Sequence, residues 1–283
     1  MIKFFRLMSS PHVPLASLIV AMLVIGMPHA ARAHEVFKTP EAAADALFSA
    51  AKAEDANAIL KILGRGGAQI ASSGDAVADA EMRSRFVSAY TAKHQVAMEG
   101  DNRAILVVGS EDYPFPIPLV RKGDQWRFDT VAGRTEILKR RIGRNELNTI
   151  QAALAYVDAQ NEYADKDHGD GGTGIYAQRI VSQPGKKDGL YWPTSQGDDP
   201  SPLGELAARA TAEGYRIGGE RAPFHGYYFK ILTKQGRAAA GGAMDYVVNG
   251  KMIGGFALVA YPASYRNSGV MTFVVNHNGT IYQ

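Results

Sequence analysis

The run FHGYYFKIL at residues 224–232 carries the strongest β-strand signal of the chain, because aromatic and β-branched residues dominate it. Two further runs of this kind follow, FALVAY at residues 256–261 and VMTFVV at residues 270–275. Asn278-Gly279 then leads into TIY at residues 280–282. An Asn-Gly pair between apolar runs is typical of a β-hairpin turn. These segments predict an antiparallel meander of about four strands at the C-terminus.

Helices are predicted before this meander. A long helix is expected from Asn145, its N-cap, to about Ala164, with an apolar stripe formed by Leu147, Ile150, Leu154 and Val157. A short basic helix at residues 135–141 precedes it, and Gly143 separates the two. A further helix over residues 201–213 is expected to bury Leu203, Leu206 and Ala210. We expect the long helix to pack on the meander.

The N-terminal half shows helical periodicity followed by short strands. Helices are predicted over residues 37–63 and 81–93. Strand candidates then lie at residues 95–98, 103–108, 117–121 and 126–129. Helices followed by antiparallel strands are typical of an α+β domain. The whole chain is therefore predicted to be α+β, with one module at residues 34–142 and a second, the long helix plus meander, at residues 143–283.

The first 33 residues have the pattern of a secretory signal peptide. Lys3 and Arg6 precede an apolar run at residues 15–27, and Ala31-Arg32-Ala33 is a small-residue cleavage site. The run is shorter than the roughly 18 residues that a membrane helix needs, and no later stretch reaches that length. We expect a periplasmic or secreted protein that is cleaved near Ala33 and has no transmembrane segment in its mature chain.

Charge and cysteine content exclude several classes of function. The signal segment holds three of the 31 basic residues and none of the 28 acidic ones, so the mature chain has no net charge. A nucleic-acid partner is therefore not expected. The chain contains no cysteine, which excludes disulfides and thiol chemistry.

An acidic, glycine-rich loop after the long helix is the sharpest metal-site candidate. Asp165, Asp167 and Asp170 place three oxygen ligands close together, and oxygen ligands of this type suit Ca²⁺. Tyr176 stands where a helix–loop–helix calcium site would supply its bidentate glutamate, so the ligand set is incomplete. The alternative is a solvated turn in which the aspartates form Asx-turns.

An aromatic wall is the candidate ligand site. The aromatic residues that could line a groove for a glycan or a peptide are Tyr191, Trp192, Tyr227, Tyr228, Phe229, Tyr261 and Tyr265. As the ligand site we name Tyr191, Trp192, His225 and Tyr227, which would form a wall around the acidic loop. The alternative is that these side chains are core residues, because aromatic residues on strands bury large areas.

No motif assigns a reaction. Ser49 and Lys52 match the S-x-x-K pattern of serine acyltransferases, but the S-D-N and K-T-G elements of those enzymes are missing. There is no G-x-S-x-G elbow. We therefore name no catalytic residue and expect a non-catalytic binding or assembly-accessory protein of the cell envelope. The alternative is a hydrolase or glycan-active enzyme with its site between the two modules.

Several strings in order carry a resemblance to a known family. They are DGLYWP at residues 188–193, SPLG at 201–204, HGYYFK at 225–230, GGFALVA at 254–260 and GVMTF at 269–273. They resemble a family of bacterial exported proteins known as domain of unknown function 2950. The resemblance covers the whole mature chain and implies export, and it carries no catalytic residue with it. Another envelope protein, a glycan or a peptide is the partner class we expect.

Two looser resemblances concern architecture. The long helix, polar loop and meander are similar to the globular part of type IV pilins and pseudopilins, although here the helix lies in the middle of the chain. The first module looks like the cone-shaped fold of nuclear-transport-factor-2-like proteins.

Overall fold

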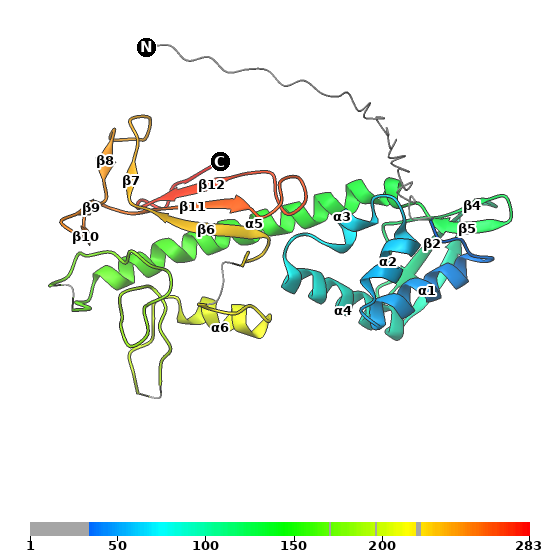
Figure 1. Cartoon of the computed structure of the whole chain (residues 1–283), viewed down its shortest axis with the longest axis horizontal. Helices are drawn as coiled ribbons and strands as arrows, with labels where there is room; N and C mark the ends of the chain where they lie inside the picture. The colour runs from blue at the N-terminus through cyan, green and yellow to red at the C-terminus, as the bar shows by residue number, and fades with distance from the viewer. Residues whose placement is uncertain (1–33, 170, 196, 219–221) are drawn as a thin grey trace, which may run out of the picture. The chain divides into compact units, whose positions relative to one another are not determined.

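The computed structural model describes residues 34–169, 171–195, 197–218 and 222–283 (Figure 1). The predicted signal peptide at residues 1–33 lies outside the described residues. The described chain combines helices with antiparallel sheets, which confirms the predicted α+β class. Within it, no helix has both the length and the apolar character required to span a lipid bilayer.

Four helices come first: α1 (Pro40–Lys52), α2 (Ala56–Leu63), α3 (Gly67–Ala71) and α4 (Ala76–Ala92). The prediction of one helix over residues 37–63 is wrong. Glu54 turns the chain with a φ of 54°, and Asp55 then begins α2 by accepting a hydrogen bond from the Ala58 N–H. The Asp55 carboxylate, in the middle of the stretch predicted as one helix, therefore caps the start of a second helix.

The first sheet has the strand order β1-β2-β4-β5, with β3 paired to β2, and all pairs are antiparallel. Its strands are β1 (His94–Met98), β2 (Arg103–Val108), β3 (Tyr113–Pro114), β4 (Leu119–Lys122) and β5 (Gln125–Phe128). Ala104, Leu106 and Val108 alternate into the core on β2. Helices α1 and α4 pack against this sheet, as the predicted helix-plus-sheet module requires.

A single helix, α5 (Thr130–Ala164), replaces the two that the sequence predicts. Asp129 caps it, and Gly143 lies inside it without ending it. One glycine costs a helix interior only about 1 kcal/mol, which flanking helix formers offset. Asn145 is therefore not an N-cap. It is buried in the middle of α5 and donates from Nδ2 to the Ser268 carbonyl at 2.9 Å.

The apolar stripe predicted on α5 is also partly wrong. Leu147 is 66% exposed and Leu154 is 37% exposed. The buried face of the helix carries smaller and polar side chains, namely Thr149, Ala152, Ala153, Tyr156, Val157, Ala159 and Gln160. Small residues let a helix approach a sheet closely, so the side that packs is set by the fit to the sheet rather than by the largest apolar residues.

The predicted C-terminal meander is confirmed. Its strand order is β13-β12-β11-β6, and every pair is antiparallel. The strands are β6 (Tyr227–Leu232), β11 (Ala257–Pro262), β12 (Phe273–Asn276) and β13 (Ile281–Tyr282). The segment between β6 and β11 forms two small ladders from β7 (Lys234–Gln235), β8 (Met244–Asp245), β9 (Val247–Val248) and β10 (Lys251–Met252).

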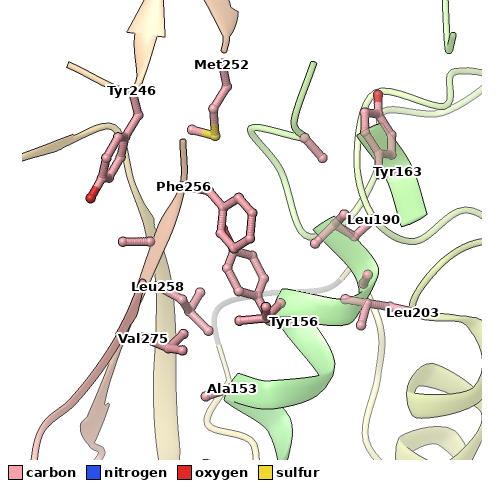
Figure 2. Packing of buried hydrophobic residues seen from close by; sticks show 14 of the residues in the cluster. Ala153, Tyr156, Tyr163, Leu190, Leu203, Tyr246, Met252, Phe256, Leu258 and Val275 are labelled. Atoms are coloured by element: carbon pink, nitrogen blue, oxygen red, sulfur yellow. The ribbon is translucent and has the colours of Figure 1, made fainter. Parts of the chain in front are cut away.

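Helix α5 packs on β11 and β12 around one large apolar core. Figure 2 shows its centre, where the rings of Tyr156 and Phe256 meet edge to face with centroids 5.6 Å apart. Leu190 and Leu203 close the core from the side of helix α6 (Gly204–Ala212). This helix is a few residues shorter than the helix predicted over residues 201–213, and it buries Ala207 and Ala210.

We expect the protein to lose stability above about pH 10, the usual tyrosine pKa. Burial raises the pKa of Tyr90, Tyr156, Tyr215, Tyr227 and Tyr246. The folded state therefore holds these protons more tightly than the unfolded state does. The contribution of these tyrosines to the free energy of unfolding is fully present below pH 10 and falls as the pH rises past it. Urea unfolding at pH 8 and pH 11 measures the difference, and titration of all 13 tyrosines near pH 10 without unfolding would contradict it.

Candidate functional site

The acidic loop lies at the end of α5. Asp165 is the C-cap of the helix, and the Oδ1 atom of Asp167 accepts a hydrogen bond from the Gly169 N–H at 2.8 Å. Asp170 lies outside the described residues. Among the residues that are described, no group of three or more His, Asp or Glu side chains is arranged to hold a metal ion. The Ca²⁺ site thus stays a prediction.

Trp192 is the aromatic residue that lies beside this loop. It is buried and lines a polar pocket of about 670 Å³ together with Asp167, His168 and Lys187. The Lys187 Nζ atom lies 5.4 Å from the centroid of the indole ring. The indole N–H is buried and has no hydrogen-bond partner among the described residues.

His225 and Tyr227 lie elsewhere. His225 has a φ of 49°, and its Nε2 atom is 3.3 Å from Oε2 of Glu213. Tyr227 is fully buried and donates its hydroxyl to the Met271 carbonyl at 3.0 Å. Neither residue lines the pocket that contains Trp192. The structure therefore brings Trp192 and the acidic loop together, and it separates them from His225 and Tyr227.

An apolar cavity of about 570 Å³ lies between α5, α6 and the edge of the C-terminal sheet. Tyr156 and Leu258, two core residues that Figure 2 labels, line it from the side of the core. Phe224, Tyr228 and Phe229 form one wall, on and beside strand β6. Leu203, Leu206, Ala207 and Ala210 of the α6 region form another, with Tyr191 and residues 179–183 completing it. Of the aromatic residues predicted to line a groove, Tyr191, Tyr228 and Phe229 line this cavity, and of the four residues named as the ligand site Tyr191 does so.

The charged groups at the cavity are basic. Arg179 and Arg216 line it and are both exposed. The Arg179 Nε atom lies 3.8 Å from Oδ2 of Asp188, whereas Arg216 forms no ion pair within the described chain. No Asp, Glu or His occurs among the described lining residues. The cavity thus combines an apolar interior with positive charge at its surface.

Tyr215 fixes one end of the cavity, and sequence reasoning missed it. Its hydroxyl donates to Oδ2 of Asp75 at 2.9 Å, and the same oxygen accepts the Gly226 N–H at 2.8 Å. Burial, and then the charge of Asp75, raise the pKa of Tyr215 and keep it protonated as a donor. Asp75 is recognisable in the sequence as a helix cap, but no local signal connects it to partners so far along the chain.

Gly226 is required by this arrangement. Its φ is 78°, and a Cβ atom there would lie 2.5 Å from Nδ2 of Asn145. Only glycine combines a left-handed backbone with such a close approach. The turn at residues 225–226 therefore holds Phe224 beside Tyr227, where Phe224 becomes part of the cavity wall.

Comparison with known proteins identifies the family of the chain. A family model described as "Protein of unknown function (DUF2950)" matches residues 34–283. Because this match covers nearly the whole sequence, the chain belongs to that family. Searches of curated proteins and of solved structures found no match.

Proposed function

We propose that this member of the DUF2950 family is an exported, non-catalytic binding protein of the bacterial envelope, which holds an apolar group of its ligand in the 570 Å³ cavity. The observation that carries the proposal is the composition of this cavity. Its described lining is mainly aromatic and aliphatic, with Ser182, Gln183 and two arginines and no Asp, Glu or His. Such a lining binds apolar surface well and lacks the acid and base that a hydrolase needs.

Two features of the sequence support a role in the envelope. The signal-peptide pattern of residues 1–33 supports export, with the binding site reaching its ligand in the periplasm or outside the cell. The resemblance of the predicted long helix, polar loop and meander to the globular part of pilin-like proteins is the second support. An assembly-accessory role, in which the ligand is part of another envelope protein, fits both features.

A catalytic alternative rests on one pair. His225 and Glu213 lie 3.3 Å apart beside the cavity, within the reach of a general base and the carboxylate that orients it. Neither of the two lines the cavity, and neither has a nucleophile placed against it by a described hydrogen bond. Because the pair is close enough to act together but lacks a nucleophile and a place in the cavity lining, hydrolysis ranks second to ligand binding.

Binding of a dansylated C11 fatty acid, followed by fluorescence, tests the proposal. Leu206→Asp places a charge in the wall of the cavity and is expected to weaken binding at least tenfold, about 1.4 kcal/mol. Ala208→Asp is the matched control, because Ala208 lies on the exposed face of the same helix. Equal binding by both variants would show that the cavity is not the ligand site, and absence of binding by the unmodified protein would show that the cavity does not take a free acyl chain.

A further inference from the structure

Strand β6 is the last strand on its side of the C-terminal sheet, so one of its edges faces away from β11. Backbone hydrogen bonds show which residues present their polar groups to this outer edge. The Gly226 carbonyl points inward and accepts the Ala263 N–H at 2.9 Å. The backbone N–H and carbonyl of Tyr227 point outward, because both pair with Phe224, at 3.1 and 2.8 Å. The direction of the backbone N–H and carbonyl groups alternates from one residue of a strand to the next. Those of Phe229 and Ile231 therefore also point outward.

Both ends of the outer edge are covered, and its middle has no backbone partner among the residues that the structure describes. Phe224 covers the edge at Tyr227, and the Tyr246 N–H covers it at the other end by donating to the Thr233 carbonyl at 2.8 Å. Between them, no hydrogen bond joins the N–H or the carbonyl of Phe229 or Ile231 to any other described residue outside the β6–β11 ladder. Two donors and two acceptors therefore alternate along a short, unpaired length of strand.

The open edge borders the apolar cavity. Phe229 contributes to both, because it lines the cavity and its backbone N–H and carbonyl face the edge. A strand added here would pair with Phe229 and Ile231. Its residues directly opposite these two would point their side chains to the same face of the sheet, toward α5 and the cavity. The intervening residue would point its side chain away, on the face that carries Lys230.

We propose that β6 binds an extended peptide segment of another protein by antiparallel β-strand addition, the pairing used throughout this sheet, with an apolar side chain opposite Phe229 at the cavity and a second one opposite Ile231. This inference rests on the proposed binding function and specifies its ligand. A peptide backbone is the ligand whose alternating N–H and C=O groups match the open edge, whereas an acyl chain satisfies none of them. An acidic residue between the two apolar ones would meet Lys230, which is exposed.

Charge argues against a second copy of this chain as the occupant. An antiparallel pair of two β6 strands that uses Phe229 and Ile231 of both copies is centred on Lys230. It would place the two Lys230 side chains directly opposite each other, and like charges at that position destabilise a strand pair. Arg179 and Arg216 at the cavity add further positive charge. The partner segment is therefore expected to be apolar and acidic.

Backbone methylation of a defined probe tests this proposal. The probe is a fluorescein-labelled peptide with the central sequence Thr-Val-Glu-Val-Thr. N-methylation of both valines removes the N–H groups that would face β6, and we expect it to weaken binding at least tenfold. N-methylation of the glutamate is the matched control, because its N–H faces away, and it is expected to change binding less than threefold.

Amide hydrogen exchange on the full mature chain gives a second readout. The probe peptide is expected to slow exchange at Phe229 and Ile231 at least tenfold and to leave Tyr228 and Lys230, which pair with β11, unchanged. Binding of the fatty acid without binding of the peptide, or equal binding of the valine-methylated peptide, overturns strand addition and leaves the proposed function intact. Failure of both ligands to bind overturns both. Protection of the two amides without peptide, together with a dimer in light scattering, overturns the proposal in favour of a second copy.

Discussion

Arg141→Ala is expected to lower the free energy of unfolding by about 3–5 kcal/mol. Arg141 is only 2% exposed, although it stands in a basic stretch of the sequence. Its guanidinium donates to the carbonyls of Gln69 and Ile70 and, at 2.8 Å, to Oδ1 of Asn267. Removing it leaves the buried Ile70 carbonyl and two partly buried acceptors without this donor, and a buried acceptor left unpaired costs about 1–3 kcal/mol before the structure relaxes.

Of the charges near the buried Arg141 guanidinium, Asp79 stabilises its charged form and Arg144 destabilises it. Burial lowers the pKa of its guanidinium, the nearby charge of Asp79 raises it, and Arg144 lowers it again. Asp79 is itself fixed, because both of its carboxylate oxygens accept the Ser73 N–H, at 3.0 and 2.9 Å. The hydrogen bonds to α3 and to Asn267 therefore hold Arg141 in place more than the ion attraction does.

Urea unfolding measures this effect, and Arg140→Ala is its matched control. Arg140 is the neighbouring residue, but it is half-exposed, forms its ion pair with Glu136 on the same helix and lies 5.4 Å from the centroid of the Tyr113 ring. Such an exposed pair contributes at most about 1 kcal/mol, so the control is expected to change stability little. Equal effects of the two substitutions would show that Arg141 is not a buried link between α3, α5 and the segment that contains Asn267.

Asp75→Asn is expected to cost about 2–4 kcal/mol. One carboxylate oxygen of Asp75 caps α4 by accepting the N–H groups of Val77 and Ala78, both at 3.1 Å. The other accepts from Tyr215 and Gly226. An asparagine has a single side-chain oxygen and can serve only one of these two pairs. Its amide group then faces the donors of the other pair, which stay unpaired in a site that is 1% exposed.

The cavity provides a second readout for this variant. Because Tyr215 lines the cavity and Asp75 holds its hydroxyl, Asp75→Asn is expected to weaken binding of the fatty-acid probe as well as stability. Asp55→Asn is the matched control, since Asp55 caps only α2 and is exposed, and asparagine caps a helix about as well as aspartate. A change below about 0.5 kcal/mol in both variants would mean that the Oδ2 contacts of Asp75 contribute no stability.

These two buried side chains bear on the predicted division into modules at residues 34–142 and 143–283, which stays a prediction. Arg141 joins α3 to Asn267, and Asp75 joins α4 to Tyr215 and Gly226, so both connect residues on opposite sides of the predicted boundary. Helix α5 also runs through that boundary without a break. Limited proteolysis tests the division, because two independent modules require a cleavable segment between about Thr135 and Asn145.

Local patterns in the sequence were sufficient for much of the fold. Strand propensity in residues 224–232, 256–261 and 270–275 predicted the meander, because a strand with alternating burial needs little more than its own residues and a turn. The caps of α1 and α2 are likewise local contacts between a side chain and the next turn of backbone. Local patterns also misled, as where Gly143 was given too much weight in α5 and the Asp55 cap too little between α1 and α2.

Tertiary structure alone decided the buried face of α5, the roles of Arg141 and Asp75, and the cavity. Leu147 and Leu154 lie exposed while Thr149 and Gln160 are buried, because the close fit of helix to sheet outweighs the hydrophobicity of single residues. The partners of Asp75 are 140 and 151 residues away along the chain, a separation at which no local pattern operates. The open edge of β6 is also a tertiary property. Propensity identifies a strand, and only the order of strands in the sheet decides which of its hydrogen-bonding groups stay unpaired.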